Sequence, residues 1–184
     1  MDAPTDLRAR VLEILREHGY ERRDEPFRLA SGELSRDYVD AKRAVGEGAR
    51  LRQVAEALTE LASDVEWDAA GGLTMGADAF AHALSVLTGR AWFSVRKEAK
   101  GHGTRAAIEG ADPKGLRVFL VDDVVTTGGS IIRALDAVEA AGGRVVLASA
   151  VCDRGDRTRE ALDARGIAYE PLVTFRDLGI EPVG

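Results

Sequence analysis

The 184-residue chain contains a single cysteine, Cys152, and therefore cannot form an internal disulfide bond. Chains without disulfides are typical of reducing compartments. No apolar run approaches the roughly 18 residues needed to cross a membrane. The first residues lack the basic and apolar regions of a signal peptide. These absences predict a cytoplasmic protein that has no membrane partner.

The chain also has fewer basic than acidic residues. Lysine and arginine together number 25 against 31 aspartate and glutamate residues, which gives a net charge of −6. An acidic chain is poorly suited to non-specific binding of nucleic acids, so we expect no nucleic-acid partner. The 45% hydrophobic and 30% charged residues are typical of a soluble globular protein, and the length fits one domain.

The hydrophobic pattern alternates between helical spacing and short apolar runs. It predicts helices at 7–19, 51–61, 77–87, 131–138 and 159–164. It predicts strands on both sides of a turn within 27–40, and at 67–70, 91–95, 117–121, 145–151 and 169–173. This alternation indicates an α/β fold with a mostly parallel central sheet flanked by helices. The polar stretch 97–114 is predicted to be a long loop, which is uncommon in a compact domain unless the loop is functional or disordered.

The most informative segment is 117–130. An apolar strand leads into Asp122 and Asp123, and small or hydroxyl-bearing residues separate this pair from the next helix, namely Thr126, Thr127, Gly128, Gly129 and Ser130. Parallel sheets bind ligands at the carboxyl ends of their strands. A helix N-terminus favours anions, and glycines let the backbone curl around them. The segment therefore predicts a cup for a phosphate group.

The two aspartates need a separate explanation, because carboxylates beside a phosphate cup repel phosphate. Ribose hydroxyls, or a magnesium ion beside them, are suitable partners. The segment lacks both the Gly-Lys-Ser/Thr of nucleotide-triphosphate loops and the Gly-x-Gly-x-x-Gly of dinucleotide-binding proteins. The acid pair and the cup together predict a phosphoribosyl site. The alternative is a strand end followed by an ordinary turn.

A second signal is the basic segment 96–105. Arg96, Lys97, Lys100 and Arg105 carry its positive charge, and Glu98 is the one acid in it. Cations of this kind stabilise the charge that grows on a departing pyrophosphate. A closing loop also excludes the water that would hydrolyse an activated sugar. The segment predicts a lid over a pyrophosphate group, and the alternative is a solvated basic loop.

Both segments resemble motifs of one family. Residues 121–130 resemble the motif that binds phosphoribosyl pyrophosphate (PRPP) in type I phosphoribosyltransferases, and Arg-Lys-Glu-x-Lys-x-His-Gly at 96–103 resembles the mobile loop of orotate phosphoribosyltransferases. The resemblance implies a type I phosphoribosyltransferase fold in a single domain, 1–184, with a small hood element formed by roughly 1–45 and the C-terminal tail. It also implies a homodimer in which the basic loop reaches the neighbouring subunit's site.

The resemblance assigns roles to particular residues. The catalytic residues are Lys100, the principal cation, and Asp122 and Asp123, which orient the ribose and stabilise its developing positive charge. PRPP is bound by Arg96, Lys97, Lys100, His102, Asp122, Asp123, Val124, Val125, Thr126, Thr127, Gly128, Gly129 and Ser130. The pyrophosphate turn consists of Thr74, Met75 and Gly76. Orotate is bound by Tyr38, Val39, Thr126 and Arg154. Magnesium is carried by PRPP, without a direct protein ligand.

Two positions depart from the family pattern. Many members have a lysine where this chain has Ala30, and some have one where it has Gly76. Arg28, Lys42 and Arg43 are candidates to supply the missing charge.

The resemblance implies transfer of 5-phosphoribosyl from PRPP to orotate, which gives orotidine 5′-monophosphate and pyrophosphate in pyrimidine biosynthesis. One alternative is a phosphoribosyltransferase for another base, from which Arg154 would distinguish it. Another is a PRPP-sensing transcription regulator on the same fold. The acidic charge and the short segment of about 25 residues before Phe27 disfavour the regulator, because a regulator needs added DNA-binding structure.

Overall fold

A six-stranded sheet forms the centre of the computed structural model, which describes residues 6–29, 32–97 and 108–183. The strands lie in the order β5-β4-β3-β6-β7-β8. β3 (Ala69–Leu73), β4 (Ala91–Val95), β6 (Arg117–Val125), β7 (Arg144–Asp153) and β8 (Val173–Thr174) run parallel, and β5 (Ile108–Gly110) is antiparallel to β4. The α/β fold with a mostly parallel sheet is therefore confirmed.

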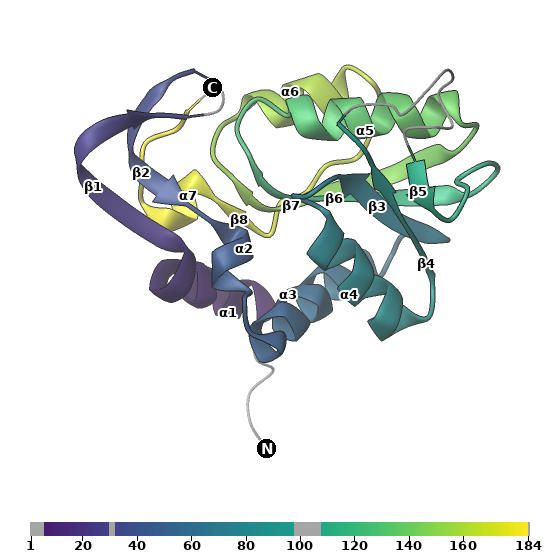
Figure 1. Cartoon of the computed structure of the whole chain (residues 1–184), viewed down its shortest axis with the longest axis horizontal. Helices are drawn as coiled ribbons and strands as arrows, with labels where there is room; N and C mark the ends of the chain where they lie inside the picture. The colour runs from purple at the N-terminus through teal and green to yellow at the C-terminus, as the bar shows by residue number, and fades with distance from the viewer. Residues whose placement is uncertain (1–5, 30–31, 98–107, 184) are drawn as a thin grey trace.

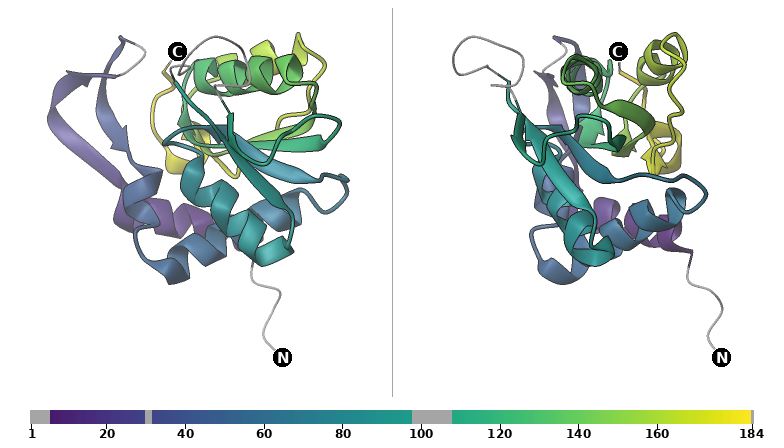
Figure 2. Two further views of the ribbon diagram at one scale, coloured as in Figure 1. Left: turned by 45° about the vertical axis from the view of Figure 1, so that its right-hand side comes forward. Right: turned by 90° about the vertical axis from the view of Figure 1, so that its right-hand side faces the viewer.

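Helices cover both faces of the sheet (Figures 1 and 2). One layer contains α1 (Leu7–Ile14), which continues as a π-helix over Leu15–Gly19, together with α3 (Gly48–Leu61) and α4 (Asp78–Thr88). The other contains α5 (Gly129–Ala140) and α6 (Arg157–Asp163). Since neighbouring residues of a strand face opposite sides, Val118 and Leu120 of β6 pack with the α5 layer, whereas Phe119 and Val121 pack with the α3 and α4 layer.

A two-stranded antiparallel hairpin stands apart from the central sheet. It is formed by β1 (Tyr20–Arg28) and β2 (Leu34–Val39), and Figure 1 shows it projecting at the left of the molecule. The short helix α2 (Ala41–Ala44) leads from the hairpin back to the domain, and α7 (Phe175–Leu178) follows β8. This hairpin occupies the segment in which the sequence predicts a hood.

Several predicted boundaries are wrong, and all for tertiary reasons. The expected loop 97–114 contains β5, which pairs with β4 although it is only three residues long. The strand predicted at 67–70 lies at Ala69–Leu73, because Gly71 and Gly72 stay in the ladder with β4 instead of turning. The strand predicted at 169–173 is reduced to a bridge at Tyr169 and the two residues of β8.

The most consequential difference concerns β6. The sequence places the strand end before Asp122, whereas β6 continues to Val125 because Val124 and Val125 pair with Cys152 and Asp153 of β7. The acid pair is consequently held within a strand.

Among the described helices, none combines the length and apolar character that a bilayer crossing requires.

Candidate functional site

The acid pair lies near the carboxyl end of β6 at the middle of the sheet. The Asp122 side chain is buried, and the backbone N–H of Asp123 donates to its Oδ1 at 2.9 Å. Burial, together with the charge of Asp123, raises the pKa of Asp122 to about 7. The nearby Ser130 hydroxyl acts in the opposite direction and lowers the pKa of Asp122, because it stabilises the charged form. The pair therefore needs a cation or hydrogen-bond donors nearby to carry two negative charges.

The predicted phosphate cup is the connection from β6 to α5. Gly128 caps α5 with a positive φ of 73°, a conformation that favours glycine. A β-carbon there would also lie 3.1 Å from Thr158. A cavity of about 330 Å³ opens at this turn and is lined by Leu73, Lys97, Val124, Val125, Thr126, Thr127, Gly128, Gly129, Ser130 and Arg133. The structure thus brings the predicted cup residues and Lys97 around one cavity at a helix N-terminus, which suits an anion.

The predicted pyrophosphate turn, Thr74, Met75 and Gly76, joins β3 to α4 beside the acid pair. A β-carbon at Gly76 would lie 2.7 Å from Oδ1 of Asp123 and would also meet the Asp122 carboxylate. With glycine at position 76 the two carboxylates can lie directly against the turn, and a larger residue there would require them to shift.

Asp78 fixes this turn and was not singled out from the sequence. Its Oδ2 accepts a hydrogen bond from the Thr74 hydroxyl at 2.7 Å, and its Oδ1 accepts one from the Ser94 hydroxyl of β4 at 2.6 Å. The pyrophosphate turn is thereby tied to the strand that leads into the basic segment. A carboxylate in the first turn of α4 is the only sequence signal for this role.

The three candidate replacement cations have different surroundings. The ammonium group of Lys42 contacts the carboxylate of Asp123. Arg28 donates to the carbonyl of Gly32 at 2.6 Å, and Arg43 donates to the carbonyl of His18 at 3.0 Å. Of the three, Lys42 is the one that meets the acid pair. Ala30 lies outside the described residues.

Arg154 follows β7 and is buried against the hairpin. Its Nη1 donates to the carbonyl of Asp37 at 2.9 Å, and its Nη2 lies 3.4 Å from the Ser35 hydroxyl. The Nε atom is buried and has no hydrogen-bond partner among the described residues. The backbone N–H of Arg154 donates to the carbonyl of Val125, next to Thr126. Arg154 thus links β2, through its side chain, with the end of β6 that leads into the cup, through its backbone.

Tyr38 and Val39, the other predicted acceptor residues, lie at the end of β2. Val39 is buried in the core, and the Tyr38 ring packs edge-on against Phe27 with 5.6 Å between centroids. The guanidinium group of Arg23 also lies over this ring, 5.0 Å from its centroid. The hairpin therefore holds the backbone of Tyr38 and Val39 near Arg154 through packing of its own side chains.

Only the start of the basic segment can be described. Arg96 forms an ion pair with Glu109 of β5 at 3.0 Å, and Lys97 lines the cup cavity. Lys100 and His102 lie outside the described residues.

Cys152 is buried, and burial raises its thiol pKa to about 12, so the thiol stays protonated and is a poor nucleophile. Within the described ranges, no three His, Cys, Asp or Glu side chains gather as metal ligands would.

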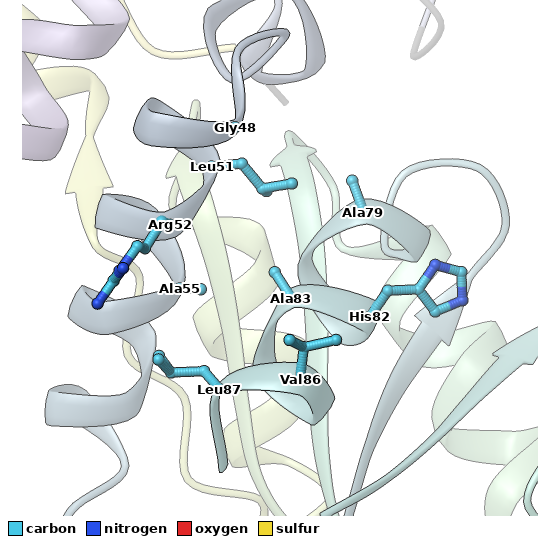
Figure 3. Close-up of a pocket in the computed structure, with 9 residues that line it drawn as sticks. All are labelled: Gly48, Leu51, Arg52, Ala55, Ala79, His82, Ala83, Val86 and Leu87. Carbon is cyan, nitrogen blue, oxygen red and sulfur yellow. The ribbon is translucent and has the colours of Figure 1, made fainter. Parts of the chain in front are cut away.

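A second hollow lies outside the predicted site. It is a mostly apolar groove of about 620 Å³ between α3 and α4, lined by Gly48, Leu51, Arg52, Ala55, Ala79, His82, Ala83, Val86 and Leu87 (Figure 3). His82 points from α4 towards β4, where its ring meets Trp92 edge-on with 4.2 Å between centroids. None of the predicted site residues lines this groove.

Fold and site together define a phosphoribosyltransferase. Residues 48–167 match the family model described as "Phosphoribosyl transferase domain", a segment that spans α3 to α6 and hence contains the acid pair and the cup. The chain belongs to the orotate phosphoribosyltransferase family. It is 38% identical over 181 residues to the orotate phosphoribosyltransferase of Corynebacterium glutamicum (strain R), with 95% of each chain covered.

Two further comparisons support the same family assignment. The chain is 40% identical over 154 residues to the orotate phosphoribosyltransferase of Mycobacterium avium, which covers 83% of this chain and 86% of the relative. The crystal structure of the Mycobacterium tuberculosis orotate phosphoribosyltransferase in complex with PRPP matches with a TM-score of 0.79 and 35% identity, covering 95% of this chain and 99% of that one. The resemblance inferred from the two sequence motifs is therefore confirmed.

Proposed function

We propose that this protein transfers the 5-phosphoribosyl group from PRPP to orotate, giving orotidine 5′-monophosphate and pyrophosphate in pyrimidine biosynthesis. The observation that carries the proposal is the convergence at one sheet edge of a phosphate cup, a buried acid pair and Arg154. A cup for the 5′-phosphate next to carboxylates for the ribose hydroxyls fits the donor. A guanidinium group under the hairpin fits the carboxylate of orotate, which it can bind bidentately.

In the reaction, the bond from the ribosyl carbon to pyrophosphate breaks, a bond from that carbon to a ring nitrogen of orotate forms, and the proton of that nitrogen is released. The sugar carries positive charge in the transition state, and the leaving oxygen gains negative charge. Asp122 and Asp123 orient the ribose and stabilise its positive charge, whereas Thr126 to Ser130 hold the 5′-phosphate. Arg96, Lys97, Lys100 and His102 cover the pyrophosphate, and their charge assists its departure.

Magnesium enters this proposal as an ion carried on PRPP. The residues present fit such a complex. The two carboxylates lie beside the cup, where they can accept hydrogen bonds from the ribose hydroxyls and from water molecules bound to the magnesium ion. When bound, the ion neutralises part of the charge of the pyrophosphate. The protein's own contribution is to orient the sugar and to add the cations of the basic segment.

The proposal includes a homodimer whose partner covers the face of α4 and β4. Large apolar side chains are exposed there: Val86 is 87%, Leu87 40% and Trp92 37% exposed, and Met75 of the adjacent pyrophosphate turn is 71% exposed. β4 also ends at Val95, where the basic segment begins. A second copy seated on this face would lie beside the start of the basic segment and could share it between subunits.

The direct test follows orotate absorbance in a mixture of purified protein, PRPP and magnesium. Absorbance should fall with time, and omission of PRPP or magnesium should stop the reaction. Absence of orotate consumption, together with turnover of another base under the same conditions, would remove the orotate assignment and retain only the phosphoribosyltransferase class.

A further inference from the structure

Lys42 reaches the acid pair from an element far away in sequence. It lies on α2, 81 positions before Asp123, and its ammonium group contacts the Asp123 carboxylate. The helix turn that carries it is fixed in two ways. The Asp40 side chain caps it by accepting from the backbone N–H of Arg43 at 2.9 Å, and Ala41 and Ala44 are buried in the core. The lysine is therefore presented from an anchored position.

Lys42 remains charged at this position. Burial acts to lower the pKa of its ammonium group, but the hydrogen bond and charge of Asp123, together with the charges of Asp40 and Asp122, outweigh burial and raise it. Among the ion pairs of the described residues, Asp123 is paired with Lys42, and no pair involves Asp122. The ammonium group is thus the cation that the described part of the site supplies to two adjacent carboxylates.

The ammonium group also has room for a second partner. The Lys42 side chain is 47% exposed, whereas that of Asp123 is only 13% exposed. An ammonium carries three donors, and one carboxylate does not use all of them. The exposed part of the group lies beside the acids that the proposed function assigns to the ribose.

Under the proposed function, bound PRPP places its pyrophosphate close to these same acids. The negative charges of the pyrophosphate and of the two carboxylates repel each other, and this repulsion is stronger in a partly buried site than in water. The neighbouring turn supplies no cation at position 76, because the residue there is glycine, and the space beside its α-carbon is taken by the two carboxylates. Lys42 approaches Asp123 from α2 instead.

We propose that Lys42 is a donor-binding residue whose ammonium group bridges Asp123 and the pyrophosphate of PRPP. This inference rests on the proposed function, since it takes PRPP as the ligand of the cup. It adds a residue to the donor site and assigns it to the pyrophosphate end of the donor. Ligands that lack a pyrophosphate should therefore bind without its help.

The test compares two ligands of the same site by calorimetry, in the presence of magnesium. PRPP carries the pyrophosphate, whereas orotidine 5′-monophosphate occupies the cup without it. The Lys42→Met variant should bind PRPP about 10- to 100-fold more weakly than the wild type, the loss expected for one charged hydrogen bond. It should bind orotidine 5′-monophosphate within about threefold of the wild type. Lys42→Arg should recover most of the PRPP affinity.

Lys114→Met is the matched control, because Lys114 precedes β6 and lies outside the site; it should leave both affinities unchanged. Wild-type PRPP binding in the Lys42→Met variant would overturn the inference while leaving the proposed function intact. Equal weakening of both ligands would also overturn it and assign Lys42 a structural role. If the wild-type protein bound neither ligand, the proposed function itself would fail.

Discussion

The guanidinium group of Arg154 donates a hydrogen bond to the backbone carbonyl of Asp37 at 2.9 Å, across 117 positions of the chain. This bond joins the carboxyl end of β7 to the hairpin that carries Tyr38 and Val39. It leaves the Nε atom buried without a partner among the described residues. A buried donor of this kind is costly to leave unpaired, and a carboxylate that reached it would satisfy it.

Arg154 should therefore determine use of orotate rather than of PRPP. We expect Arg154→Ala to lower kcat/KM for orotate by about 100-fold or more, the scale of removing one partner from a buried charge pair. The dissociation constant of PRPP should change little, because the cup and the acid pair remain. Steady-state kinetics with orotate as the varied substrate measure the first quantity, and calorimetry measures the second.

Arg159→Ala is the control for this experiment, since Arg159 is half-exposed on α6 and pairs with Glu170. It should retain wild-type kinetics. Unchanged orotate use by Arg154→Ala would show that the carboxylate of orotate binds elsewhere.

Lys100 should act on the chemical step. Lys100→Ala should reduce kcat by about 100- to 1,000-fold, the effect typical of removing one group that stabilises transition-state charge. The melting temperature should stay within a few degrees of the wild type, and Lys114→Ala should match the wild type in both measurements. Rapid-mix kinetics at saturating PRPP and orotate give kcat directly. A near-normal rate would exclude Lys100 as the cation at the leaving group.

A shared active site predicts complementation between two inactive variants. Lys100→Ala and Asp123→Asn proteins, unfolded and refolded together in equal amounts, should form hybrid dimers with one intact site. The mixture should regain about a quarter of the wild-type activity, because half of the dimers are hybrids and each has one working site. Activity no greater than that of the separate variants would mean that the basic segment serves its own subunit.

The proposed dimer face supplies a control for this mixture. Val86→Glu introduces a charge into an apolar surface and should convert the dimer to a monomer in light scattering. Complementation should disappear when both inactive variants carry this change.

Asp122 should make the folded protein less stable as the pH rises from about 4 to 7. Its pKa in the folded state is raised to about 7, mainly by burial and then by the charge of Asp123, whereas an unfolded aspartate has a pKa of about 3.9. Stability present below the unfolded pKa is therefore lost as the pH rises through the folded pKa. Asp122→Asn does not ionise and should escape this loss.

Melting curves between pH 4 and pH 8 test this prediction. Asp122→Asn should melt several degrees above the wild type at pH 8, and the difference should shrink towards pH 4. The exposed substitution Asp64→Asn should give no such trend. A wild type that is the more stable at pH 8 would indicate that the ionised form of Asp122 is well compensated in the folded protein.

The sequence predicted those parts of the site whose functional residues are consecutive in the chain or match a family motif. The cup could be found because its chemistry lies in consecutive residues, from Asp122 to Ser130, and Arg154 could be assigned through the family resemblance. Lys42 was named only as one of three candidate replacement cations, and its contact with Asp123 could not be predicted because it depends on how α2 packs against β6. The anchoring of Thr74 and Ser94 by Asp78 was missed for the same reason.

Strand boundaries were less predictable than the site. β5 and the extension of β6 to Val125 are set by pairing with neighbouring strands, which local apolar patterns do not encode. Gly71 and Gly72 suggested a turn, yet they remain in β3, where a β-carbon at Gly71 would lie 2.6 Å from an atom of the Phe93 ring. These glycines serve close packing of the sheet rather than chain reversal.

The most direct test of the proposed function is a competition among bases in one reaction. The purified protein is incubated with PRPP, magnesium and equal concentrations of orotate, uracil, adenine, hypoxanthine and guanine, and the nucleotide products and pyrophosphate are separated and quantified. Orotidine 5′-monophosphate should form as the dominant nucleotide, in amounts equal to the pyrophosphate released. Preferential formation of another nucleotide, or of none, would contradict the account.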